Sequence, residues 1–283
     1  MSKAKAFLIL AFGSIAAFAA MDFRSFTAFL HQTARPGVDE RQFLVSWDTP
    51  IRLCTVGLDA QAHTVLDGFV DLMRRFDIDA SVQPNKRYPE CLRDGDIIVS
   101  AEAINPETFS AFSDAARAVD ATALIETPPS RFGFSTFFYD RDRNVKSLAW
   151  VNGPDLKARG ELREALVQEL FHAVSFGQDI DKTAKAFSIL HEVSPAKRGM
   201  DSPAKINTSP DGVCRFDLQL LHILSNQRPR HHKEKNLIYI PLRDIGLSDY
   251  LLSLIPAISI ARDQKTAQDA ERILAKTCSW TVP

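Results

Sequence analysis

The 283-residue sequence lacks several patterns that mark common enzyme classes. It has no Gly-x-Ser-x-Gly, no glycine-rich loop among its 12 scattered glycines, and no Cys-x-x-Cys. These absences argue against an α/β-hydrolase elbow, a phosphate-binding loop and a redox or zinc-knuckle pair. An excess of positive charge is also missing, because 34 basic residues stand against 35 acidic ones, for a net charge of −1. Nothing in this balance favours a nucleic acid partner.

An apolar run occupies residues 6–18, after a short basic start at Lys3 and Lys5. Alanines at positions 17 and 19 supply a small-x-small cleavage signal, so we interpret residues 1–20 as a secretory signal peptide. An uncleaved membrane anchor is the alternative, although the run is shorter than the ~20 residues that cross a bilayer. We therefore expect an exported protein, periplasmic or extracellular, with no stable membrane span once the signal is cleaved.

Four cysteines suit an exported chain, because oxidising compartments favour disulfides. Four cysteines allow three pairings. We expect Cys54–Cys91 and Cys214–Cys278, because each bond closes a loop within one half of the chain. The alternative is four buried thiols in a cytosolic protein, which the signal peptide would exclude.

Periodicity and turn residues predict an α+β fold with a mixed sheet. Residues 21–42 are expected to form a short, loosely held helix and a linker, and residues 43–283 a single domain. Trp47 and Pro50 are expected at the start of its first strand, and 84–94 is expected to be a polar loop. In the sheet-containing half, 43–158, strands are predicted at 51–56, 78–82, 96–100, 122–126, 132–139 and 145–151, and helices at 60–76 and 105–119.

The second half, 159–283, is predicted to be mostly helical. Helices are expected at 159–176, 217–224, 248–255 and 267–276, with a strand or buried turn at 237–240 and an irregular segment at 191–212.

The helix predicted at 159–176 carries the most specific chemical pattern in the chain. Metzincin zinc peptidases read His-Glu-x-x-His-x-x-Gly-x-x-His, with the histidines as zinc ligands and the glutamate as general base. Glu169 and His172 match this pattern, whereas the first ligand, the glycine and the third ligand do not. Gly177 is expected to make the turn after the helix in place of the missing glycine. The residues at the motif offsets are Gln168, Glu169, His172, Ser175 and Gln178.

Wider features resemble a family of bacterial secreted domains of unknown function. That family is similar in layout to metzincin-like zincins, with a sheet half, a helix at the cleft and a C-terminal half below it. The resemblance covers about residues 43–230. It implies a zincin-like fold with a degenerate site, in which Gln168, Glu169 and Asp179 lie at the cleft, and it implies no assigned activity. The features are Trp47-x-x-Pro50-Ile51-Arg52, the Glu169 helix running into Gly177-x-Asp179, Ser188-Ile189-Leu190-His191-Glu192 and Asp217-x-x-x-Leu221-His222-Ile223-Leu224.

The departures from the motif weaken the case for a metal site. Glutamine is a poor neutral ligand for zinc, which prefers histidine, cysteine or carboxylate. With His172 as the one matching ligand, tight zinc binding needs further donors, and the candidates are Asp179, His191, Glu192 and His222. A packed core histidine and a surface carboxylate are the simpler interpretation of His172 and Glu169, because Glu-x-x-His is a short and frequent pattern.

Three functions are compatible with these patterns. The preferred one is an exported, non-catalytic binding domain that holds a protein or peptide in the cleft, without a cofactor, through Gln168, Gln178 and Asp179. The second is an active zinc-dependent hydrolase, with Glu169 as general base and His172 as a zinc ligand. The third is a structural envelope protein in which this helix serves only as core.

Overall fold

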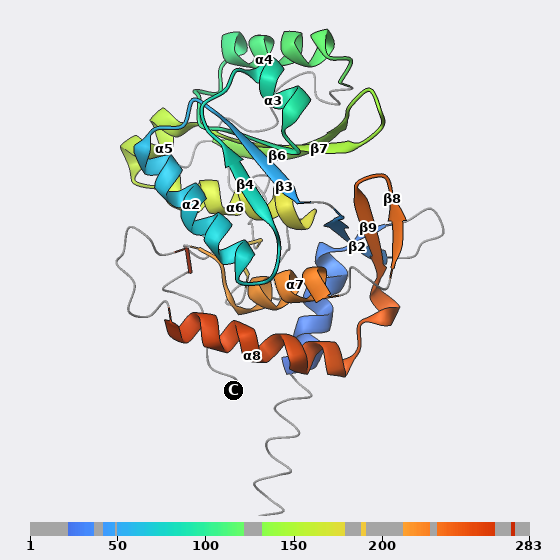
Figure 1. The fold of residues 1–283 in the computed structure, drawn as a ribbon. Helices are drawn as coiled ribbons and strands as arrows, with labels where there is room; N and C mark the ends of the chain where they lie inside the picture. The colour runs from blue at the N-terminus through green and yellow to red at the C-terminus, as the bar shows by residue number, and fades with distance from the viewer. Residues whose placement is uncertain are drawn as a thin grey trace, which may run out of the picture.

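Two β-sheets with surrounding helices make up the described structure (Figure 1). The computed structural model describes residues 22–36, 42–48, 50–121, 132–178, 188–190, 212–226, 231–263 and 273–274. A five-stranded sheet carries helices on both faces, and a four-stranded sheet lies beside it. The predicted α+β class with a mixed sheet is confirmed.

The larger sheet has the strand order β4-β3-β5-β7-β6. Four of its strands run parallel, and β6 pairs antiparallel with β7 as the predicted hairpin. The strand expected at 122–126 lies outside the described residues. The strands are β3 (Ile51–Val56), β4 (Ala80–Gln83), β5 (Ile97–Ser100), β6 (Gly133–Tyr139) and β7 (Val145–Val151).

Helices cover the two faces of this sheet with separate cores. Helices α2 and α6 pack on one face, and α3 and α4 on the other (Figure 1). The Asp59 side chain caps α2 and the Asn105 side chain caps α4. The expected loop at 84–94 instead contains α3. The helices are α2 (Ala60–Arg74), α3 (Tyr88–Asp94), α4 (Pro106–Ala118), α5 (Gly153–Arg159) and α6 (Leu162–Ser175).

The smaller sheet pairs residues 35–47, near the start of the chain, with residues 232–241. Its order is β1-β2-β9-β8, and β2 pairs antiparallel with β9, with Trp47 opposite Leu237. Trp47 therefore ends a strand of its own instead of opening β3, which corrects the expectation from the sequence. The strands are β1 (Arg35–Pro36), β2 (Gln42–Trp47), β8 (His232–Glu234) and β9 (Leu237–Pro241).

Residues 22–33 form a helix that belongs to the core, and not to a loosely held linker. Phe26 and Phe29 are fully buried against the Phe216 ring. Asp22, which is also buried, accepts hydrogen bonds from the Arg215 guanidinium and the Tyr250 hydroxyl. The helical spacing of the phenylalanines was visible in the sequence, but their distant partners were not.

The C-terminal half contributes α7 (Arg215–Asn226), the 3₁₀ turn η3 (Leu242–Asp244) and α8 (Leu247–Asp263). Both helices are longer than the sequence predicted. Of the helix expected at 267–276, residues 273–274 are described, and there Leu274 forms a parallel bridge with Val213. Among the described residues, no helix has the length and apolarity needed to cross a membrane.

The predicted disulfide between Cys54 and Cys91 is present and ties β3 to α3. Cys214 is also disulfide-bonded. Its expected partner, Cys278, lies outside the described residues.

Asn236 joins the two sheets. Its amide Nδ2 donates to the Val145 carbonyl over 2.8 Å, and its Oδ1 accepts from the Val145 N–H over 3.0 Å. The Asn236 carbonyl accepts from the Asp48 N–H over 2.9 Å. The turn between β8 and β9 is thereby fixed to the start of β7.

We expect Asn236→Ala to lower the free energy of unfolding by about 1–3 kcal/mol, because it leaves a part-buried donor and acceptor of Val145 without the side chain that serves both. Asn236→Asp should lower the free energy of unfolding by a similar amount, because a carboxylate cannot donate a hydrogen bond to the Val145 carbonyl. Urea unfolding measures both. Asn226→Ala, at an exposed asparagine, is the control and should change stability by less than about 0.5 kcal/mol. Equal losses in the control and the Asn236 variants would refute this role.

Candidate functional site

Helix α6 lies beneath β6 and β7, with its C-terminal turn directed toward the smaller sheet. Its residues from Leu170 to Ser175 are all buried. The helix ends at Phe176, which adopts the left-handed conformation with φ 55°. The sequence predicted that Gly177 would make this turn. Gly177 itself packs closely under Leu190, because a Cβ there would lie 2.7 Å from Leu190 Cδ1 and would require that side chain to shift.

Aromatic stacking holds Phe176 in this uncommon conformation. Its ring lies 4.6 Å from the Phe137 ring of β6 and 5.0 Å from the Trp47 ring of β2, measured between centroids. Trp47 Nε1 donates to the Ala173 carbonyl over 3.3 Å, and Arg35 Nε donates to the Phe176 carbonyl over 3.0 Å. The end of α6 is therefore fixed by β1, β2 and β6 together.

Glu169 and Gln168 are partly buried on α6. The Glu169 carboxylate lies beside the first residue of β6, because a Cβ on Gly133 would be only 3.3 Å from Glu169 Oε1. The Gln178 N–H donates to the Thr33 carbonyl over 3.3 Å, so this residue packs against the N-terminal helix. Asp179, the third expected contact residue, lies outside the described residues.

His172 is 7% exposed and faces the chain that follows α6. Its Nδ1 lies 2.8 Å from the Gly177 carbonyl oxygen. A carbonyl only accepts, so Nδ1 carries a proton, and in the neutral ring Nε2 is the unprotonated nitrogen. Histidine ligands of metals commonly show this orientation, and so do buried structural histidines.

Asp217 is a functional-site feature that the sequence reasoning did not identify. This α7 carboxylate is fully buried and close enough to His172 to interact with it electrostatically. It accepts from the Ser188 hydroxyl, and over 2.7 Å each from the N–H groups of Ile189 and Cys214. Burial raises the pKa of Asp217 to about 7, against the opposing effect of these donors. The available signal was the position of Asp217 as the third residue of α7. An acidic side chain at that position can accept a hydrogen bond from the N–H of the residue just before the helix, here Cys214.

The described residues do not fit a zinc site. His222 packs against the Phe76 ring at 6.3 Å, next to Asp77, so it belongs to the contact between α7 and α2. Within the described part of the chain, no three side chains of the His, Cys, Asp or Glu type gather as a metal site requires. His191 and Glu192 lie outside the described residues, so the zinc ligands expected from the sequence remain a prediction.

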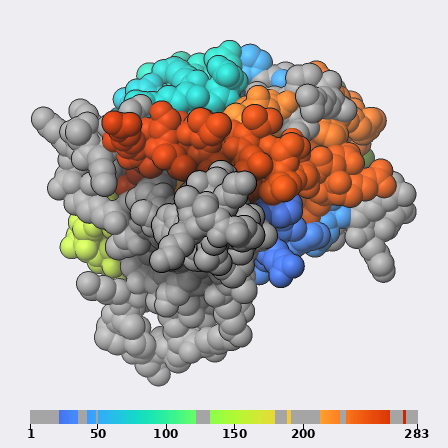
Figure 2. Space-filling view, turned by 90° about the horizontal axis from the view of Figure 1, so that it is seen from below, coloured from blue at the N-terminus to red at the C-terminus, as the bar shows by residue number. Residues whose placement is uncertain are grey.

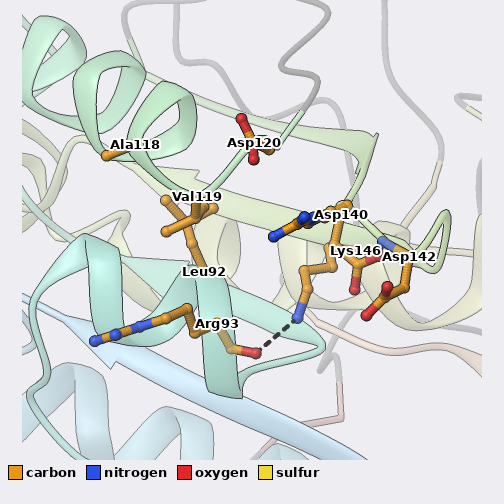
Figure 3. Close-up of a pocket in the computed structure, with 9 residues that line it drawn as sticks. Leu92, Arg93, Ala118, Val119, Asp120, Asp140, Asp142 and Lys146 are labelled. Atoms are coloured by element: carbon orange, nitrogen blue, oxygen red, sulfur yellow. Dashed lines mark hydrogen bonds between the residues drawn. The ribbon is translucent and has the colours of Figure 1, made fainter.

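A pocket of about 360 Å³ lies away from α6, on the α3 and α4 side of the sheet (Figure 3). Lys146 is buried at its edge and donates to the carbonyls of Arg93 and Gly95. Burial lowers the pKa of Lys146. The lysine therefore satisfies carbonyls at the C-terminal end of α3, and none of the expected site residues lines this pocket.

No known protein family, curated protein or solved structure compared with this chain matches it.

We expect the stability of the protein to depend on Asp217 and pH. The folded pKa is about 7 against an ordinary 3.8, so the unfolded chain releases this proton at lower pH. The free energy of unfolding should therefore fall as pH rises from about 4 to about 7, by about 4 kcal/mol at most.

Asp217→Asn removes this titration while its amide still accepts from the N–H groups and donates to Ser188 Oγ. Urea unfolding across this pH range should show that the fall is smaller in the variant than in the wild type. Asp217→Ala should be destabilised throughout, because it deprives several buried donors of their acceptor. Parallel pH profiles for the wild type and Asp217→Asn would contradict the assignment.

Proposed function

We propose that this protein is an exported, non-catalytic domain with a zincin-like fold, which binds an extended peptide segment along β6. The observation that carries this proposal is the position of β6. It is the last strand of its sheet within the described residues, and it runs directly above α6. The edge strand of a sheet is a common place for an extended peptide to add as a further strand.

The hydrogen-bond register of β6 supports an outward-facing backbone. Asn152 N–H bonds to the Phe132 carbonyl and Asp140 N–H to the Asn144 carbonyl. Because hydrogen-bonded pairs alternate in an antiparallel ladder, the even-numbered residues of β6 bond to β7. The N–H and C=O groups of Ser135, Phe137 and Tyr139 therefore point to the outer edge, where an added strand would pair with them.

The side chains near the two ends of β6 differ in charge and in aromatic character. The Glu169 carboxylate lies at Gly133, where β6 begins. Further along, the Phe137 ring is partly exposed, with the Arg35 guanidinium 5.3 Å above its centroid. A bound peptide would meet an acidic group near one end of the strand and an aromatic and basic pair near the other.

The order of elements supports the zincin-like part of the proposal. A mixed sheet comes first, the helix with Glu169 and His172 follows and packs on that sheet, and a mainly helical half comes last. Gln168 occupies the place of the first zinc-binding histidine, and glutamine binds zinc weakly. The Cys54–Cys91 disulfide supports export, because such bonds persist in oxidising compartments.

Ser135→Pro tests the peptide proposal. Proline removes the outward N–H of Ser135 and leaves the hydrogen bonds to β7 in place. We expect peptides selected from a random phage-displayed library on the wild type to bind this variant at least about tenfold more weakly by calorimetry. Ser135→Ala keeps the N–H and should bind as the wild type does. If no peptide is selected, or if both variants bind equally, the peptide proposal fails and a structural role is favoured.

The orientation of His172 favours a zinc-dependent hydrolase as the second candidate, because Nδ1 is held by a carbonyl as in many metal-ligating histidines. Under our proposal, the purified full chain should carry far less than one zinc per molecule by elemental analysis. His172→Ala should not change that content. Stoichiometric zinc that is lost in His172→Ala, together with cleavage of peptide substrates, would establish the hydrolase instead.

A further inference from the structure

The exposed face of α8 is apolar along its length. Five of the six large hydrophobic side chains that are exposed in the described structure lie on this helix. Except for the adjacent Leu251 and Leu252, they are spaced three or four residues apart, and all five lie within one arc, opposite the buried Tyr250, Ala257 and Ile260. Figure 2 shows α8 lying open across the face seen from below. The five residues, here named the α8 apolar face, are Leu247, Leu251, Leu252, Ile255 and Ile258.

The α8 apolar face has no acidic neighbours among the exposed positions of α8 whose side chains are described. Those remaining positions are Ser248, Ser259 and Arg262. Asp249 is only partly exposed, and its carboxylate accepts from the Gly246 N–H over 2.8 Å at the start of the helix. Leu252 is 62% exposed and Ile255 is 70% exposed. With 3.6 residues per turn, Ser248, Ser259 and Arg262 lie within the same arc, so hydroxyls and a cation are interspersed among its aliphatic side chains. Such an arc suits the boundary between lipid headgroups and acyl chains.

The course of the chain connects this face to the N-terminal apolar run. Asp22 accepts a hydrogen bond from the hydroxyl of Tyr250, which is in the middle of α8. Phe18, the last residue of the run, precedes Asp22 by four positions. Four residues reach about 14 Å at full extension. If residues 6–18 are retained and inserted in a bilayer, this short connection keeps α8 near the membrane surface.

We infer that, in chains that retain residues 1–20 as the uncleaved anchor, the α8 apolar face rests on the surface of a phospholipid bilayer. The run at 6–18 is shorter than a membrane span, and a single weak apolar anchor gives only marginal attachment. A second apolar contact beside it makes the attachment stable. This inference concerns the end of the molecule away from β6, and it does not depend on peptide binding there.

Flotation of the full chain with vesicles of phosphatidylcholine and phosphatidylglycerol tests the inference. The variant is Leu252→Gln with Ile255→Gln, because glutamine keeps the size and helix preference without adding charge. Tyr139→Gln is the matched control, since Tyr139 is 42% exposed on β6. N-terminal sequencing of each preparation establishes whether residues 1–20 are present.

We expect the wild type and the control to float with the vesicles and the α8 variant to lose at least about tenfold in partition coefficient. Unchanged flotation of the α8 variant, or no flotation of the wild type, overturns the inference. A wild-type dimer that the α8 variant dissociates in sedimentation velocity, without loss of flotation, assigns the face to a second copy and also overturns it. Circular dichroism checks folding, and Ile255→Gln alone replaces the double variant if the latter is unfolded.

Discussion

The structure depends on burying the C-terminal turn of α6 without leaving its polar groups unpaired. The last carbonyls of a helix have no partner inside it, and in this helix they are shielded from water. Side chains from distant segments supply the missing donors, with Trp47 Nε1 on Ala173 and Arg35 Nε on Phe176. His172 adds a bond to the Gly177 carbonyl. The smaller sheet, the hairpin and the central helix are therefore held in one arrangement by a single requirement.

The same requirement explains the polar cluster around Asp217. A buried carboxylate is tolerated only when donors surround it, and Asp217 has a hydroxyl and two N–H groups within hydrogen-bond distance. Those donors come from residues 188–190 and from the start of α7, so the carboxylate ties both segments together below α6. His172 lies at the edge of this cluster. Its bond to the Gly177 carbonyl fixes the orientation of the ring at the end of α6.

Local signals in the sequence were sufficient for much of the fold. The apolar spacing at 60–76, the cap at Asn105, the β-rich run at 51–56 and the hairpin at 133–151 are properties of neighbouring residues, and the structure has each of them. Pairing between distant segments was not readable, because nothing local links β2 to β9 or the first helix to Arg215. The candidate site was likewise predictable only where its features depend on neighbouring residues. The positions of Glu169 and His172 on one helix follow from spacing, whereas the left-handed Phe176 and the buried Asp217 depend on tertiary partners.

The distribution of exposed apolar side chains argues that two surfaces have separate roles. Single exposed hydrophobic residues are normal on proteins, whereas a cluster on one element requires an explanation. In the described structure, α8 has such a cluster and β6 has Tyr139 alone. On β6 the groups available for recognition are backbone N–H and C=O groups, which suit an extended peptide. On α8 they are aliphatic side chains, which form no directional hydrogen bonds and therefore suit contact with lipid. Because α8 lies apart from β6, below the helices that cover the lower face of the larger sheet (Figure 1), contact of α8 with a bilayer and peptide binding along β6 would use separate surfaces.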